Sequence, residues 1–167
     1  IESMQKYDGE LSFISGNHDS FRIADFLNDE ELRLAYLFIY TMPGVPYLFA
    51  GDELGQKTNR NLTSKEGGYQ RTGTRIPMVF DNTENRGFSK CKDVSKLYLP
   101  IDNETVSAME QLEDKNSLLN FIKELIKIRK SEDDLRSKDF KLLDKPLAYS
   151  RGKIKVFINL KDEDQKF

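Results

Sequence analysis

The first third of the chain has a pattern of apolar and polar residues that predicts a strand, a helix and a second strand. Apolar runs at residues 11–15 and 45–50 predict the strands. Between them, apolar side chains recur three and four residues apart over residues 30–41, which is the spacing of one helix face. Pro43 and Gly44 end this helix before the second strand. Strands that alternate with helices predict a parallel sheet covered by its helices, so we assign the chain to the α/β class.

The rest of the chain combines a long irregular stretch, one more helix and a group of short strands. Residues 56–100 are rich in Gly, Asn, Thr, Arg and Lys and lack periodicity, and connections of this length are commonly functional. Residues 117–130 carry an apolar stripe at helical spacing, with Asn116 or Ser117 as the cap. After a charged connector, three apolar runs predict strands at residues 140–143, 147–150 and 154–158, with a hairpin turn at Arg151-Gly152.

Composition limits the classes of function. The chain is 38% hydrophobic and 32% charged with a formal net charge of −2, which is typical of an ordinary globular protein. Basic residues are interspersed with acidic ones, so we expect no nucleic-acid partner, and no apolar run is long enough to span a membrane. The single Cys91 excludes an internal disulfide framework and, with His18 as the only histidine, argues against structural zinc. The low number of cysteines favours a cytoplasmic location.

Polar residues gather where the two predicted strands end. Asn17-His18-Asp19 follow the first strand, and Asp52-Glu53 follow the second. Barrel enzymes place their chemistry at the carboxyl ends of parallel strands, so we expect a functional site around the first group. Its structural alternative is a turn in which the Asn and Asp side chains bond their own backbone. Adjacent carboxylates on an extended segment point to opposite faces, so Asp52 and Glu53 are expected to be structural rather than a catalytic pair.

Several motifs together resemble the α-amylase family of glycoside hydrolases, in particular its α-glucosidase and trehalose synthase branch. Two motifs resemble strands seven and eight of the family's barrel: FISGNHD at residues 13–19 followed by Arg22, and PGVPYLFAGDELG at 43–55. Three others resemble the loop after strand eight: GGYQRTGTRIPM at 67–78, RGFS at 86–89 and KLYLP at 96–100. The resemblance covers roughly residues 10–130.

The resemblance implies the C-terminal part of a TIM (β/α)8 barrel. A complete barrel needs about 250 residues, whereas this chain has 167 and offers two strand-helix units. We therefore expect residues 1–131 to supply strands seven and eight with their helices, and residues 132–167 to begin an antiparallel C-terminal β domain. The first six units would lie upstream of Ile1. Unpaired strand edges and an uncovered apolar stripe predict that such a fragment self-associates.

The implied chemistry is cleavage or transfer of an α-glucosidic bond with retention. This reaction needs a carboxylate nucleophile and a carboxylic acid about 5 to 5.5 Å apart, and in the family both come from strands outside this chain. Asp19 matches the family's third carboxylate, which stabilises the transition state, while His18 and Asn17 match positions in the sugar site. The implied substrate is an α-linked gluco-oligosaccharide or disaccharide, with no cofactor. Members of the family often bind calcium, but no metal ligand is assigned in this sequence.

Three further residues are assigned to substrate binding, each with an alternative. Arg22 either contacts the sugar or braces Asp19 through an ion pair, and we favour bracing. Arg75 matches an arginine near the pocket mouth of the family, but an exposed loop arginine is often simply solvated. Phe80 stands where relatives usually carry Trp, so it either lines a sugar subsite with altered selectivity or packs in the core.

We therefore interpret the chain as a piece of a retaining α-glucosidase-like or α-amylase-like enzyme. A trehalose synthase or another transglycosylase is the runner-up, because hydrolysis and transfer differ only in whether water or a sugar attacks the intermediate. A non-catalytic subunit such as an amino-acid transporter heavy chain resembles the same barrel and is the alternative from another class. A stand-alone sugar-binding module is disfavoured, because the chain supplies only half a pocket.

Overall fold

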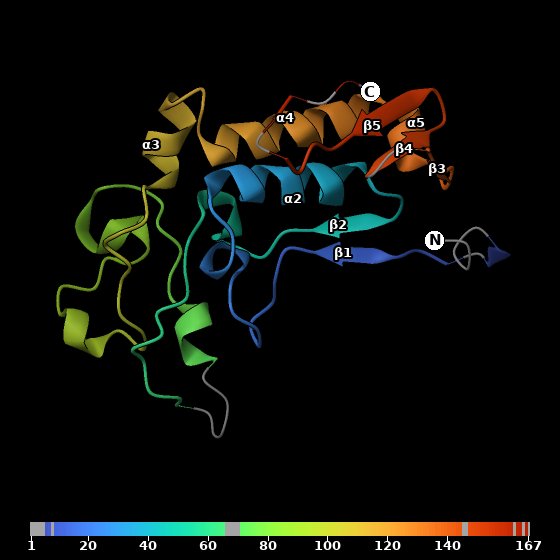
Figure 1. The fold of residues 1–167 in the computed structure, drawn as a ribbon. Helices are drawn as coiled ribbons and strands as arrows, with labels where there is room; N and C mark the ends of the chain where they lie inside the picture. The colour runs from blue at the N-terminus through green and yellow to red at the C-terminus, as the bar shows by residue number, and fades with distance from the viewer. Residues whose placement is uncertain are drawn as a thin grey trace. The chain divides into compact units, whose positions relative to one another are not determined.

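The computed structural model describes residues 6–7, 9–65, 71–144, 147–161, 163–164 and 166 (Figure 1). The chain divides into two compact units. Unit 1 consists of the residues up to 13, residues 34–47 and the residues from 124 onwards. Unit 2 consists of residues 14–33 and 48–123. Each unit is built from separate stretches of the sequence, and the expected boundary at residue 131 between a barrel part and a β domain stays a prediction.

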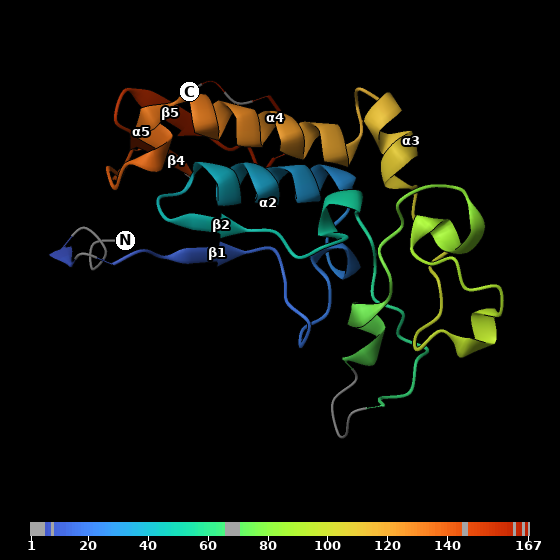
Figure 2. The ribbon, with the colours of Figure 1, turned by 180° about the vertical axis from the view of Figure 1, so that it is seen from behind.

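The two predicted strands of the α/β pattern form a small sheet. Strand β1 (Ser12–Ile14) and strand β2 (Val45–Tyr47) are neighbours and run in the same direction (Figures 1 and 2). Their approach requires glycine at position 44, which has φ +117° and where a Cβ atom would overlap the Leu11 carbonyl oxygen. Both strands are shorter than predicted, because the chain leaves the sheet after Ile14 and Tyr47.

Helix α2 (Asp29–Thr41) follows the predicted pattern within one residue. Asn28 caps its start, since the side-chain oxygen accepts hydrogen bonds of 3.0 Å from the backbone N–H groups of Glu30 and Glu31. Glu31 reaches back to the Asn28 N–H at 2.8 Å, which completes a capping box. The buried apolar residues of the helix lie on one stripe, as expected: Leu32, Tyr36, Ile39 and Tyr40.

Helix α4 (Leu118–Ser131) also matches its prediction and lies alongside α2 over residues 124–131 (Figures 1 and 2). Ile122 and Leu125 are the buried members of its stripe. The buried Arg129 donates from one guanidinium nitrogen to the carbonyl oxygens of Tyr40 and Met42 at 2.7 and 3.0 Å. A cation is favourable there, because the last carbonyls of a helix lack partners within it.

A three-stranded antiparallel sheet completes unit 1, in the order β3 (Lys141–Leu142), β4 (Ala148–Arg151) and β5 (Ile154–Phe157). The predicted hairpin turn is present one residue later than expected, at residues 152 and 153. The core of this unit joins the end of α2 to the sheet. Its buried members are Met42, Tyr149, Val156 and Ile158, with Phe13, Leu34, Leu37, Phe38, Phe140 and Ile154 packed against them.

Arg151 is a second buried arginine of unit 1 and was not expected from the sequence. Its side chain is 0% exposed and donates to the carbonyl oxygens of Thr41, Asp139 and Ser137, the last two at 2.6 Å. Burial lowers the pKa of Arg151 to about 10. Through these hydrogen bonds, the guanidinium links the end of α2 to the connector before β3. The short helix α5 (Asp133–Arg136) lies in this connector.

Unit 2 contains mostly short turns. Five 3-10 helices occur in its described part: η1 (Ile23–Asp25), η2 (Asp52–Leu54), η3 (Thr72–Arg75), η4 (Glu84–Gly87) and η5 (Val94–Lys96). The irregular stretch predicted at residues 56–100 is confirmed where it is described, and residues 67–70 of the resembling loop lie outside the described residues. Helix α3 (Ala108–Glu113) was not predicted, although Ser107 and Glu110 form a capping box at its start.

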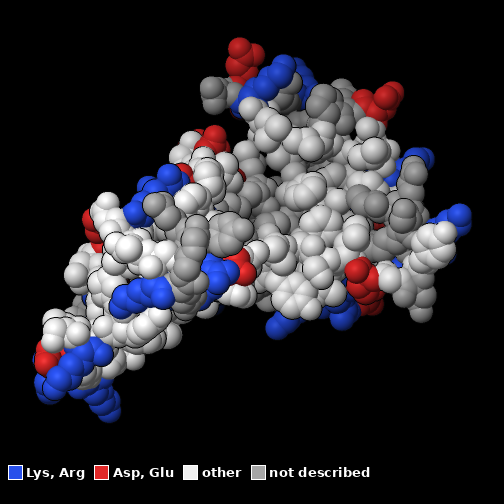
Figure 3. Space-filling view, turned by 90° about the horizontal axis from the view of Figure 1, so that it is seen from below, with Lys and Arg blue, Asp and Glu red and all other residues white. Residues whose placement is uncertain are grey.

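Two surface properties bear on the class of protein. Among the described residues, no helix is both long enough and apolar enough to cross a bilayer. Figure 3 shows basic and acidic side chains interspersed on the visible face rather than gathered into a basic stripe.

Candidate active site

The carboxylate of Asp19 is presented to solvent where the chain leaves β1. Its side chain is 49% exposed, and two arginines from one segment hold a single oxygen of it. Arg71 donates from Nη1 to Oδ1 at 2.8 Å, and Arg75 donates from Nη2 to the same oxygen at 2.9 Å. Both arginines belong to η3 or the residue before it. The predicted site residues Asp19 and Arg75 are therefore brought together.

The surroundings of Asp19 keep it ionised. Desolvation raises the pKa of Asp19, but the hydrogen bond from Arg75 and the charges of Arg71 and His18 outweigh this effect, so the pKa lies below its ordinary value. His18 is close by, with Nε2 at 3.4 Å from Asp19 Oδ2. A carboxylate that is negative at neutral pH, beside exposed hydrogen-bonding groups, can interact with sugar hydroxyls or with developing positive charge.

His18 and Asn17 have different environments. His18 is 64% exposed in its side chain, and its backbone carbonyl accepts a 3.0 Å hydrogen bond from Arg75 Nε. Asn17 accepts a 2.8 Å hydrogen bond from the backbone N–H of Asp19. This is the local turn that the sequence offered as the structural alternative, and it shapes the loop that presents Asp19. The turn and a sugar-binding role are compatible.

The interpretation that Arg22 braces Asp19 through a direct ion pair is wrong. Arg22 is 2% exposed, and its Nη1 forms an ion pair with Asp52 Oδ1 at 2.8 Å. Its Nε donates to the Thr74 carbonyl oxygen at 3.2 Å, and the guanidinium lies over the ring of Phe49. The sequence could not reveal this partner, because Asp52 follows thirty residues later and is reached only through the fold.

Asp52 and Glu53 are structural, as expected, but for a different reason. They lie in the 3-10 helix η2 and not on an extended segment. Asp52 is 0% exposed, and Glu53 accepts a 2.8 Å hydrogen bond from the Gly51 N–H. Burial raises the pKa of both carboxyl groups. Since their oxygens are engaged in the fold, neither residue is placed to flank a glycosidic bond.

The last predicted residue, Phe80, is exposed. Its ring is 45% accessible, so Phe80 is not a core residue of the described structure. Its backbone N–H donates to the Arg86 carbonyl oxygen at 2.9 Å, which holds this segment against η4. Phe80 therefore lies outside the core of the described residues, and a role in a sugar subsite stays a prediction.

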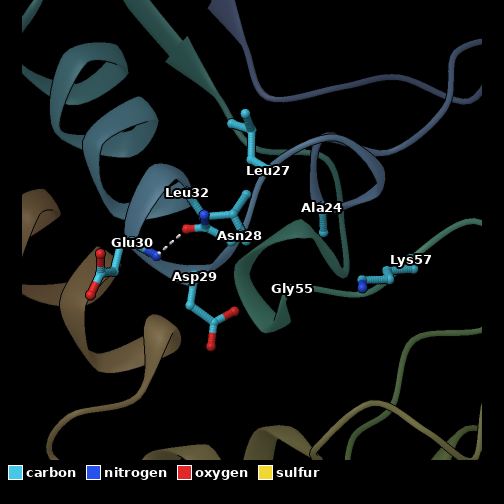
Figure 4. Close-up of a pocket in the computed structure, with 8 residues that line it drawn as sticks. All are labelled: Ala24, Leu27, Asn28, Asp29, Glu30, Leu32, Gly55 and Lys57. Atoms are coloured by element: carbon cyan, nitrogen blue, oxygen red, sulfur yellow. Dashed lines mark hydrogen bonds between the residues drawn. The ribbon is translucent and has the colours of Figure 1, made fainter. Parts of the chain in front are cut away.

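A cavity of about 500 Å³ lies at the start of α2 (Figure 4). Figure 4 shows the capping hydrogen bond of Asn28 at its wall. The predicted sugar-site residues do not line this cavity. Its lining consists of Ala24, Leu27, Asn28, Asp29, Glu30, Leu32, Gly55 and Lys57. Within the part of the chain that the structure describes, no group of three or more His, Cys, Asp or Glu residues is arranged to hold a metal ion.

Arg71 is the site residue that the sequence interpretation missed. Its side chain is 29% exposed and contacts Asp19 as closely as Arg75 does. The available signal was its position in the resembling loop, four residues before Arg75. Spacing alone did not separate it from a solvated loop arginine.

Adjacent co-directional strands that alternate with a helix, with a carboxylate presented where a strand ends, are features that α/β barrels share. A family model described as "Alpha amylase, catalytic domain" matches residues 2–138. The chain therefore belongs to the α-amylase family, and the resemblance seen in the motifs is confirmed.

Individual relatives agree with this assignment. The chain is 26% identical to an alpha-glucosidase of Apis mellifera over 181 residues, which covers 94% of this chain and 31% of the relative. It is 31% identical to a trehalose synthase of Pimelobacter over 120 residues, which covers 67% of this chain and 20% of the relative. The crystal structure of Bacillus licheniformis trehalose-6-phosphate hydrolase superimposes with a TM-score of 0.71 at 22% identity, over 87% of this chain and 33% of that one.

The chain spans about a third or less of the length of these proteins. The structural match shows that the chain shares its fold with part of a TIM-barrel enzyme of this family.

Proposed function

We propose that this chain is the C-terminal part of the catalytic barrel of a retaining glycoside hydrolase that acts on α-glucosidic bonds. In this proposal, β1 and β2 are strands seven and eight of the barrel. The antiparallel sheet from β3 to β5 begins the C-terminal β domain, with the boundary at residue 131. The family assignment and the order of strands and helices support this placement.

The observation that carries the proposal is the exposed Asp19 carboxylate held by Arg71 and Arg75. A retaining glycosidase passes through an oxocarbenium-like transition state between a nucleophilic carboxylate and a carboxylic acid. We assign these two groups to the part of the barrel outside this chain. Asp19 would then be a third carboxylate that stabilises the developing charge without forming a covalent bond.

The neighbours of Asp19 have distinct roles in this proposal. Arg71 and Arg75 neutralise and orient the carboxylate through Oδ1, while His18 lies beside its other oxygen, Oδ2. His18 donates a hydrogen bond to a hydroxyl of the same sugar. Asn17 shapes the turn, and the exposed Phe80 offers a face to the sugar on the acceptor side. The buried Arg22 supports the loop and does not contact substrate.

The substrate we propose is an α-linked gluco-oligosaccharide or disaccharide. The alpha-glucosidase of Apis mellifera among the relatives favours hydrolysis. The trehalose synthase of Pimelobacter favours transfer as a second candidate, with a sugar in place of water as the attacking group.

The test is turnover of p-nitrophenyl α-glucoside and maltose by the full-length protein that contains this chain, with the products followed by proton NMR. Retention predicts that α-glucose is released first and then mutarotates. Larger or rearranged oligosaccharides at high maltose would identify a transglycosylase. The release of β-glucose would contradict the retaining mechanism, and the absence of turnover on α-glucosides would contradict the proposed function.

A further inference from the structure

One buried carboxylate is bonded to both ends of the loop that carries Asp19. Ser15, at the start of the loop, donates its hydroxyl to Asp52 Oδ2 at 2.7 Å. Arg22, at the end of the loop, donates from Nη1 to Asp52 Oδ1 at 2.8 Å. Asp52 is 0% exposed and Arg22 is 2% exposed. The two oxygens of Asp52 thus fix the separation between the residues on either side of positions 16–21.

The start of this loop is also packed tightly against Asp52. A Cβ atom at Gly16 would lie 3.0 Å from Asp52 Oδ2, so a larger residue there would displace the carboxylate. The Ser15 hydroxyl accepts a 3.0 Å hydrogen bond from the Phe49 N–H while it donates to Asp52. The end of β1 is therefore joined to the segment that follows β2.

The guanidinium of Arg22 connects the same loop to the segment that supplies Arg75. Its Nε donates to the Thr74 carbonyl oxygen, and the Thr74 hydroxyl donates back to the Ser20 carbonyl oxygen at 2.9 Å. Thr74 directly precedes Arg75. Both sides of the contact between Asp19 and Arg75 are therefore held by hydrogen bonds that lead to Arg22 and Asp52.

The charge of Asp52 suits this task. Burial raises the pKa of Asp52, while the Ser15 hydrogen bond and the Arg22 charge act in the opposite direction. Charge-assisted hydrogen bonds are shorter and stronger than neutral ones, so a buried guanidinium–carboxylate pair restricts the movement of the segments it joins. Since Asp52 has no solvent exposure, it can influence a substrate only through other residues.

We propose that Asp52, with its partners Ser15 and Arg22, is a positioning unit that sets where the Asp19 carboxylate and the Arg75 guanidinium meet. This inference rests on the proposed function of Asp19. A misplacement of about 1 Å far from the reacting bond can lower a rate by about 100-fold. The unit therefore determines kcat rather than the affinity for substrate.

The test is a double-mutant cycle in the full-length protein with p-nitrophenyl α-glucoside as substrate. Asp52→Asn keeps the shape of the side chain and removes its charge, and we expect kcat to fall by about 100-fold with little change in KM. In an Asp19→Asn background, the same substitution should cause almost no further loss, because it acts through Asp19. Ser15→Ala removes one of the two links and keeps the ion pair. It is the second probe, and it carries the test if Asp52→Asn fails to fold.

The control is Tyr149→Phe, which removes a buried hydrogen bond to Thr41 in unit 1 and should leave kcat unchanged. Equal losses from Asp52→Asn or Ser15→Ala in the presence and absence of the Asp19 carboxylate would overturn the inference, since a residue with a general structural role lowers both backgrounds alike. If Asp19→Asn itself leaves kcat unchanged, the proposed role of Asp19 fails as well. The two failures are thus distinguishable.

Discussion

At the scale of single residues, the account depends on how two arginines converge on one carboxylate oxygen. Arg71 and Arg75 both donate to Asp19 Oδ1, while Oδ2 faces His18. Both arginines also help to keep the Asp19 carboxylate ionised. The site therefore depends on arginine geometry as well as on charge, since lysine cannot bond two acceptors from fixed positions.

We expect Arg71→Gln to raise the pKa of Asp19. The charge of Arg71 is one of the causes that keep this pKa below its ordinary value, so its removal favours the protonated form. Carbon NMR of the side-chain carboxyl during an acid titration measures the change. Arg136→Gln alters an exposed arginine that pairs with Asp133 and should leave the Asp19 titration as it is. An unchanged titration of Asp19 in Arg71→Gln would contradict this account of its charge.

The lowered pKa of Asp19 also affects the stability of the fold. The pKa of Asp19 is lower in the folded chain than in the unfolded chain, so its ionised form stabilises the fold above the unfolded pKa. This contribution is lost as the pH falls through the folded pKa. Asp19→Asn should therefore be less stable than the wild type at neutral pH, and the difference should disappear in strong acid. Urea denaturation at several pH values measures it, and a difference that grows in acid would have the wrong sign.

We expect Arg75→Lys to lower kcat/KM in the full-length protein by about 10- to 100-fold. The lysine keeps the charge but loses the simultaneous bonds to Asp19 Oδ1 and to the His18 carbonyl oxygen, and a charge-assisted hydrogen bond is worth about 1.5 to 3 kcal/mol. Steady-state kinetics with p-nitrophenyl α-glucoside measure the loss. Wild-type kinetics in this variant would mean that Arg75 contributes only its charge.

At the scale of elements, the parts that the sequence predicted are those governed by local pattern. Helices α2 and α4 carry long apolar stripes, and both were placed within one residue. The end of α2 was clear from Pro43 and Gly44. Helix α3 was missed because six residues give too short a stripe, although its capping box at Ser107 was a readable signal.

Elements and contacts that depend on distant partners were not predictable. The 3-10 helix η2 replaces the extended segment expected after the second strand, and within it Asp52 turns inward to meet Arg22 and Ser15. The motif at positions 17–19 and Arg75 were recognised from the sequence, but Arg71 was not, and neither were the bonds of both arginines to Asp19, since they join residues more than fifty positions apart. Local sequence therefore identified the carboxylate, and tertiary contacts determine its environment.

The cap of α2 gives a prediction for this scale. Asn28→Ala removes the acceptor of two backbone N–H groups and should lower the free energy of unfolding by about 1 kcal/mol. Urea denaturation followed by circular dichroism measures the change. Asn61→Ala, at an exposed loop position, is the matched control and should have little effect. An equal stability of both variants would show that the cap contributes nothing to the fold.

At the scale of the whole molecule, the surface of the isolated chain includes apolar strand residues. Val45 and Tyr47 of β2 are 40% and 55% exposed. Exposed apolar side chains on an open sheet favour association. In the proposed full-length protein, the remaining barrel strands would cover such residues.

We therefore expect the isolated 167-residue chain to self-associate. Sedimentation velocity over a concentration series should show species larger than the monomer, and Tyr47→Thr should shift the distribution towards the monomer. Leu160→Thr changes an exposed apolar residue outside the β1–β2 sheet and should have a smaller effect. A monomer at all concentrations would contradict the expected association.

The central claim is that Asp19 stabilises the transition state of α-glucoside cleavage. The most direct measurement compares kcat for p-nitrophenyl α-glucoside between the full-length wild-type protein, Asp19→Asn and the exposed-carboxylate control Asp93→Asn. The account predicts a loss of about 100- to 1,000-fold for Asp19→Asn, as for the removal of one transition-state-stabilising group, and no loss for the control. Equal kcat values for Asp19→Asn and the wild type would contradict it.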